Sequence, residues 1–252
     1  MESTREESFV ASSWAVVVVL GVIVVVGASV QRLAGIGFAL VAVPALVMLL
    51  GPAEGVVLAN CAAAVISAAG LADTWRQVRL AAMIPLVVAA SCTVPAGAWV
   101  ATRLPELVLL AGTGLLVSVA AMLVMWGARV PALRGATGAV AAGAASGFMN
   151  SSAGVGGPVV SLYAVNVGWT VREFVPNAQF YGLVVNALSV AAKGLPQLTT
   201  PVWLLIAAAI AAGLVIGQAL AQRVPERPAR LIVLLLALTG GLTTLGKGLW
   251  SL

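Results

Sequence analysis

The most chemically distinctive stretch of the chain is a polar, glycine-rich break between two apolar runs, Asn150-Ser-Ser-Ala-Gly-Val-Gly-Gly-Pro158. Its side chains and backbone N–H groups are hydrogen-bond donors without full charge, a set that can bind an anion and still release it. Pro158 suits the first turn of a new helix, where its missing N–H leaves nothing unsatisfied. The candidate binding residues here are Asn150, Ser151, Ser152, Gly154, Gly156 and Gly157. Close helix packing is the alternative role for the glycines.

A second copy of this pattern lies upstream, in Gln31-Arg-Leu-Ala-Gly-Ile-Gly-Phe38. One offset of 119 residues (154 − 35 = 119) pairs the two copies: Gln31 with Asn150, Gly35 with Gly154, and Gly37 with Gly156. Both copies therefore begin with an amide side chain. We predict that Gln31, Gly35 and Gly37 belong to the same binding site as the first stretch.

The composition places these breaks in a membrane protein. The chain has 252 residues, of which 62% are hydrophobic and 8% charged, and its mean hydropathy is +1.11. Such values are typical of a polytopic helical membrane protein. Irregular backbone inside a membrane is tolerated only where protein buries it or where it lines a cavity. The formal net charge of +5 falls mostly at the ends of apolar runs, so we expect membrane lipid as a partner and no nucleic acid.

Several kinds of chemistry are excluded by the residues that the chain lacks. It contains no histidine, which removes His-based hydrolases and His-ligated metal sites. Cys61 and Cys92 both lie in apolar runs and are interpreted as small buried hydrophobic residues. Ser/Lys pairs with Lys193 or Lys247 are the remaining enzymatic option. We therefore predict no enzyme, no metal site and no cofactor, and the acidic start of the chain indicates that the first apolar run is retained rather than cleaved as a signal.

The repeat continues along the chain. The segment Gly97-Ala-Trp-Val-Ala-Thr-Arg-Leu-Pro-Glu106 resembles Gly217-Gln-Ala-Leu-Ala-Gln-Arg-Val-Pro-Glu226 at an offset of 120 (223 − 103 = 120). Asn60 and Asn177 pair at an offset of 117 (177 − 60 = 117), each within an apolar run. Three blocks in the same order indicate an internal duplication with a first half at residues 1–130 and a second half at residues 131–252.

The predicted fold is an all-α integral membrane protein. Ten apolar segments are expected, at residues 10–30, 36–50, 54–72, 80–101, 105–126, 135–149, 157–168, 174–193, 202–221 and 229–249. Segments 36–50 and 157–168 are too short to cross alone and are predicted to be half-helices that follow the two breaks. Because each half holds five segments, the halves are predicted to be inverted-topology repeats.

The distribution of charge predicts the orientation. With ten crossings, one face collects Arg32, Arg76, Arg79, Arg129, Arg134, Arg172, Arg223, Arg227 and Arg230, and the other Arg5, Arg103, Lys193 and Lys247. The positive-inside rule then predicts that the first face is cytoplasmic and that both termini lie outside.

The duplicated glycine break and the Gly-x-x-x-Ala-x-Arg-x-Pro ending resemble the sulfite exporter TauE/SafE family of membrane transporters over essentially the whole chain. The resemblance implies a multi-pass protein of a bacterial-type cytoplasmic membrane that carries small anions such as sulfite, organosulfonates or short organic acids. It also implies coupling to a proton or ion gradient, while the repeat itself predicts alternating access, in which one half rocks against the other. The sequence leaves the direction of transport open, as export or uptake. It also leaves open the oligomeric state, which includes a homo-oligomer. Two alternative functions remain: a passive anion channel and a non-transporting subunit of a complex.

Polar residues inside the apolar segments complete the candidate site. Asn60 and Asn177 either line a central path or form hydrogen bonds between helices. The Tyr181 hydroxyl is a further candidate donor, with packing as its alternative role. Gln179 and Asn186 are interpreted as structural. Arg32 is interpreted as a loop residue rather than a ligand, and Asp73 as the partner of Arg76 in a local ion pair.

Overall fold

The computed structural model describes residues 2–35, 37–127, 133–223 and 226–250. The chain is 88% helical, and the described residues contain no strand. The helices are α1 (Glu2–Ala34), α2 (Phe38–Leu50), α3 (Pro52–Ala72), η1 (Trp75–Gln77), α4 (Leu80–Arg103), α5 (Glu106–Met125), α6 (Gly135–Ala153), α7 (Gly157–Val167), α8 (Val171–Lys193), α9 (Thr200–Ala221) and α10 (Glu226–Trp250). The predicted all-helical class is confirmed.

Helix length and hydropathy indicate how the bundle fits a membrane. Within the described residues, six helices are long and apolar enough to cross one, namely α1, α3, α4, α5, α9 and α10. Helices α6 and α8 are long enough but less apolar, because they carry most of the polar candidate residues. Helices α2 and α7 have 13 and 11 residues, or about 20 and 16 Å at a rise of about 1.5 Å per residue. Each is shorter than a hydrocarbon core of about 30 Å.

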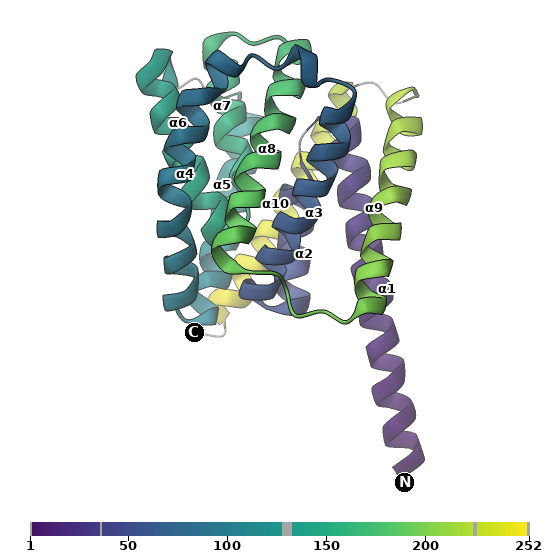
Figure 1. Ribbon diagram of the computed structural model, residues 1–252. Coiled ribbons are helices and arrows are strands. Elements are labelled where there is room, and N and C mark those ends of the chain that lie inside the picture. The colour runs from purple at the N-terminus through teal and green to yellow at the C-terminus, as the bar shows by residue number, and fades with distance from the viewer. Residues whose placement is uncertain (1, 36, 128–132, 224–225, 251–252) are drawn as a thin grey trace.

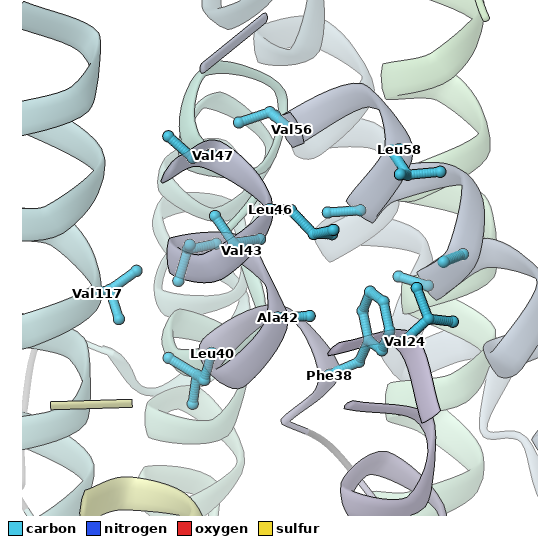
Figure 2. Packing of buried hydrophobic residues seen from close by; sticks show 14 of the residues in the cluster. Val24, Phe38, Leu40, Ala42, Val43, Leu46, Val47, Val56, Leu58 and Val117 are labelled. Atoms are coloured by element: carbon cyan, nitrogen blue, oxygen red, sulfur yellow. The ribbon is translucent and has the colours of Figure 1, made fainter. Parts of the chain in front are cut away.

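The short helix α2 lies inside the bundle. Its side chains Phe38, Val43 and Leu46 have no exposed surface and pack against neighbouring helices (Figure 2). The Phe38 ring lies against α1, where a Cβ added at Gly27 would come within 2.7 Å of the ring. Because interiors are close-packed, this contact requires a residue without a side chain on α1. Hydrophobic burial therefore fixes the half-helix that follows the first break.

Helices α3 and α8 pack face to face at the centre of the bundle through small residues. A Cβ at Gly70 would lie 2.9 Å from the Gln179 side chain, and one at Gly182 would lie 2.8 Å from the Ser67 hydroxyl. The contacts pair later residues of α3 with earlier residues of α8, so the two helices are antiparallel. Small residues at such a crossing let the backbones approach closely.

The contacts of the outer helices recur at the spacing of the sequence repeat. Gly97 of α4 packs on Phe148 and Ser151 of α6, and Gly217 of α9 packs on Ser29 and Arg32 of α1. The α6 residues lie 119 positions after their α1 counterparts (148 − 29 = 151 − 32 = 119). The division into halves at residue 130 stays a prediction, since this boundary lies outside the described residues.

Both termini lie at one end of the bundle, beyond which α1 extends (Figure 1). The opposite end holds η1, the α7–α8 connection and the C-terminal end of α9, which carry Arg76, Arg79, Arg172 and Arg223. The ends of α4, α8 and α10, with Arg103, Lys193 and Lys247, lie at the end of the termini. Arg129 lies outside the described residues, as do the side chains of Arg5, Arg227 and Arg230.

Candidate functional site

A cavity of about 70 Å³ lies between the two glycine breaks. Its wall is built from α1, α2, α3, α6, α7 and α8 together with the backbone of the first break. Its polar or glycine lining residues are Gln31, Gly35, Gly37, Ser67, Asn150, Gly157, Gln179, Tyr181, Gly182 and Asn186. The structure thus brings together one amide side chain from each copy of the sequence repeat.

A first amide cluster lies beside the cavity at the first break. The Gln31 Nε2 atom donates to Ser67 Oγ at 3.2 Å and to Gln179 Oε1 at 3.3 Å. Gln179 Nε2 in turn donates to the Gly35 carbonyl at 3.1 Å. All three polar side chains are buried, so each needs these partners to offset its desolvation. The cluster ties the end of α1 to α3 and α8.

A second amide cluster lies beside the cavity at the second break. The Asn150 Nδ2 atom donates to Asn186 Oδ1 and to Ser189 Oγ, both at 3.1 Å. Asn60 Nδ2 lies 3.5 Å from the Asn150 carbonyl oxygen. This cluster ties the end of α6 to α8 and α3, as the first ties the end of α1.

The two clusters share one sequence register. An offset of 119 residues pairs Gln31 with Asn150, Ser67 with Asn186, and Asn60 with Gln179 (150 − 31 = 186 − 67 = 179 − 60 = 119). The pairing of Asn60 with Asn177 is therefore wrong: Asn177 Oδ1 accepts from the Arg79 N–H at 2.8 Å, away from the cavity. Gln179 and Asn186, interpreted from the sequence as structural only, both line the cavity.

A sequence signal for these residues exists on α8. Gln179, Gly182, Asn186 and Ser189 recur at spacings of three and four residues, which places them on one face of a helix. That face is polar or small in a helix whose remaining interior residues are mostly apolar. We call this face the polar stripe of α8. It faces α3 and runs past the cavity from the first cluster to the second.

The cavity offers donors but no full charge. Among the described residues its lining contains no Asp, Glu, Lys or Arg. The Tyr181 hydroxyl is buried, with 4% of the residue exposed, and has no hydrogen-bond partner. A buried hydroxyl without a partner carries a free-energy penalty, which a bound acceptor would remove.

The glycines of the two breaks have different structural roles. Gly35 and Gly154 have φ values of +75° and +74°, in the left-handed region that favours glycine, and end α1 and α6. Gly156 has an ordinary φ of −88°, but a Cβ there would lie 2.6 Å from the Ser146 carbonyl oxygen. At Gly157, which lines the cavity at the first turn of α7, an added Cβ would meet no atom within 4 Å.

Some predicted site residues lie outside the cavity lining. Ser151 and Ser152 donate their hydroxyls back to carbonyls of α6, at Gly147 and Phe148 respectively. Asn177 holds the start of α4 against α8, and Asn60 reaches the second cluster without lining the cavity. The predicted site residues that do line it are Gln31, Gly35, Gly37, Asn150, Gly157 and Tyr181.

A larger pocket of about 320 Å³ adjoins the cavity and shares Gly35, Gly37 and Phe174 with it. Its wall includes Arg32 and Trp169, at the end of the bundle opposite the termini. We call this pocket the vestibule.

Arg32 is held at the rim of the vestibule. Its Nε donates to Gln218 Oε1 at 2.8 Å, and its guanidinium lies 3.7 Å from the Asp73 carboxylate. The expected local pair of Asp73 with Arg76 is therefore wrong. Asp73 instead joins the end of α3 to the end of α1.

Comparison with known proteins adds one match. Residues 19–244 match the model of a family described as sulfite exporter TauE/SafE. No curated protein and no solved structure matches the chain.

Proposed function

The chain belongs to the sulfite exporter TauE/SafE family of membrane transporters, and we propose that it moves a small oxyanion such as sulfite through the cavity between its two glycine breaks. The observation that carries the proposal is the cavity itself, which is flanked by two equivalent amide clusters. The family consists of transporters and not of enzymes. The membrane concerned is, in this proposal, a cytoplasmic membrane of bacterial type.

The lining suits an anion that must bind and leave. The Tyr181 hydroxyl, the first turn of α7 at Gly157, and the side-chain amide N–H groups once the clusters separate can all donate to oxygen atoms. The N-terminus of a helix also carries a partial positive charge. A site built from such donors binds without the strong attraction of a buried cation, so release stays fast.

The size of the cavity supports a substrate of few atoms. Pockets for drug-sized ligands measure about 300–1,000 Å³, whereas this cavity measures about 70 Å³. Sulfite, with one sulfur and three oxygens, is favoured over bulkier organosulfonates and longer organic acids. Larger anions would require the helices around the cavity to separate.

The clusters support alternating access between two related halves, residues 1–130 and 131–252. The first cluster lies on the vestibule side of the cavity, and the second lies on the side that faces the termini. In this mechanism one cluster opens while the other stays closed, so the anion is never exposed to both sides. The shared offset of 119 residues supports an inverted-repeat relation between the halves. A gradient of protons, ions or charge drives the cycle.

The test is sulfite flux into proteoliposomes that contain the purified protein, with and without a pH gradient. We expect saturable flux that small oxyanions inhibit more strongly than bulky sulfonates. Flux that rises linearly with concentration would indicate a passive channel instead. No flux of any tested anion, together with co-purification of a partner at a fixed ratio, would indicate a subunit without transport activity.

A further inference from the structure

The polar stripe of α8 ends in a cation. Lys193 follows Ser189 by four residues, so it continues the face that carries Gln179, Asn186 and Ser189. The first members of the stripe line the cavity or form its clusters. Lys193 therefore lies next along the same face, toward the end of the bundle that holds the termini.

The Lys193 ammonium group is held at the second break. Its Nζ donates to the Ser151 carbonyl oxygen at 2.9 Å, in the last turn of α6. Ser151 follows Asn150, whose side chain lines the cavity. Among the described residues, no carboxylate lies within 4 Å of Nζ. Among the described residues, the hydrogen-bond partner of the Lys193 Nζ atom is thus a carbonyl oxygen and not an acidic group, which leaves this basic side chain available to an anion.

The first break has a cation in the corresponding place. Arg32 lies in the last turn of α1, 119 residues before Ser151 (151 − 32 = 119), and lines the vestibule. Helices α1 and α6 thus each end beside the proposed substrate path. The carbonyl groups at these helix ends carry partial negative charge, which disfavours an anion. Arg32 offsets this negative charge at the vestibule mouth of the path. Lys193, on α8, offsets it at the mouth on the side of the termini.

We propose that Lys193 is the anion-receiving residue at the mouth on the side of the termini. In the closed arrangement its ammonium group binds the Ser151 carbonyl, and when the Asn150–Asn186–Ser189 contacts separate it binds an oxygen of the arriving or departing oxyanion. The inference rests on the proposed transport function. It assigns recognition of the oxyanion at this mouth to the Lys193 side chain. The residues that recognise the oxyanion therefore differ between the two ends of the path.

The test compares Lys193→Gln with Lys193→Arg in right-side-out and inside-out membrane vesicles that contain the full chain. Glutamine can still donate to the Ser151 carbonyl but carries no charge, whereas arginine keeps the charge. Lys247, the other lysine of the chain, lies in the last turn of α10 at the same end of the bundle. Lys247→Gln is therefore the matched control.

We expect Lys193→Gln to raise the KM for sulfite presented on the side of the termini by about 10-fold or more, the scale of a lost charge-assisted hydrogen bond. The KM on the other side should change less than 2-fold, and Lys193→Arg and Lys247→Gln should resemble the wild type. The thermal stability of Lys193→Gln in detergent should match that of Lys247→Gln.

Two results would overturn the inference while the proposed function stands: equal KM values for Lys193→Gln and Lys247→Gln, or an equal loss of flux in Lys193→Gln and Lys193→Arg. The second result would mean that Lys193 only caps α6. Absence of saturable sulfite flux in the wild type would refute the proposed function, and the role of Lys193 with it.

Discussion

A substitution at Gly157 tests the cavity without disturbing its walls. An added Cβ at this position meets no atom within 4 Å, and the residue lines the cavity at the first turn of α7. Its φ lies outside the left-handed region, so alanine or leucine is compatible with the backbone. The new side chain would therefore occupy space that the substrate needs, while the fold stays intact.

The magnitude follows from the volumes. A methyl group takes roughly the space of one water, and the cavity, at about 70 Å³, has room for only a small ligand. Forcing one extra carbon into a filled site costs about 1–3 kcal/mol, and about 1.4 kcal/mol corresponds to a tenfold change in affinity. We expect Gly157→Ala to raise the KM for sulfite roughly tenfold and Gly157→Leu to abolish saturable flux.

The assay is concentration-dependent sulfite flux in proteoliposomes, with thermal unfolding in detergent as the measure of folding. The matched control is Gly112→Leu in α5, where an added Cβ also meets no atom within 4 Å but no cavity is lined. If Gly157→Leu transported sulfite with the KM of the wild type, the cavity would not be the substrate site, and the size argument would fail with it.

The remaining predictions separate binding from stability. Tyr181→Phe should raise the KM for sulfite several-fold without lowering the melting temperature, because the hydroxyl has no partner in the protein; an unchanged KM would remove Tyr181 from the site. Asn177→Ala should cost about 1–3 kcal/mol of stability, since it leaves the Arg79 N–H without its acceptor, with the KM unchanged in the flux assay. Gly154→Ala should cost about 1–2 kcal/mol at its positive φ, measured by thermal unfolding against Gly112→Ala.

The helices and breaks were predictable because their signals are local. The predicted segments 36–50 and 157–168 correspond to α2 and α7, since glycine and proline mark helix ends in the sequence itself. The amides Gln31 and Asn150 were predictable from the repeat, and both line the cavity. Periodicity and punctuation thus located the elements that carry the candidate site.

The partners across the site were predicted less well. Asn60 was paired with Asn177 because the two residues share a type, although the offset of 119 already pairs Asn60 with Gln179. The contact of Arg32 with Asp73 joins helices that are far apart in the sequence, and no local pattern predicts it. Gly156 and Gly157 look alike in the sequence, but only the packing shows that one faces a carbonyl and the other faces open space.

The uncharged lining of the cavity has an electrical consequence. Among the described residues no cation or carboxylate lines it, so in the proposed transport an anion that crosses without a co-transported cation carries its net charge across the membrane. A potential of about 100 mV does about 2.3 kcal/mol of work on each elementary charge, equivalent to about a 50-fold concentration ratio. In a cell whose interior is negative, this work pushes anions outward. Transport of this kind would be favoured in the export direction by the voltage, and a voltage clamp would record it as a current.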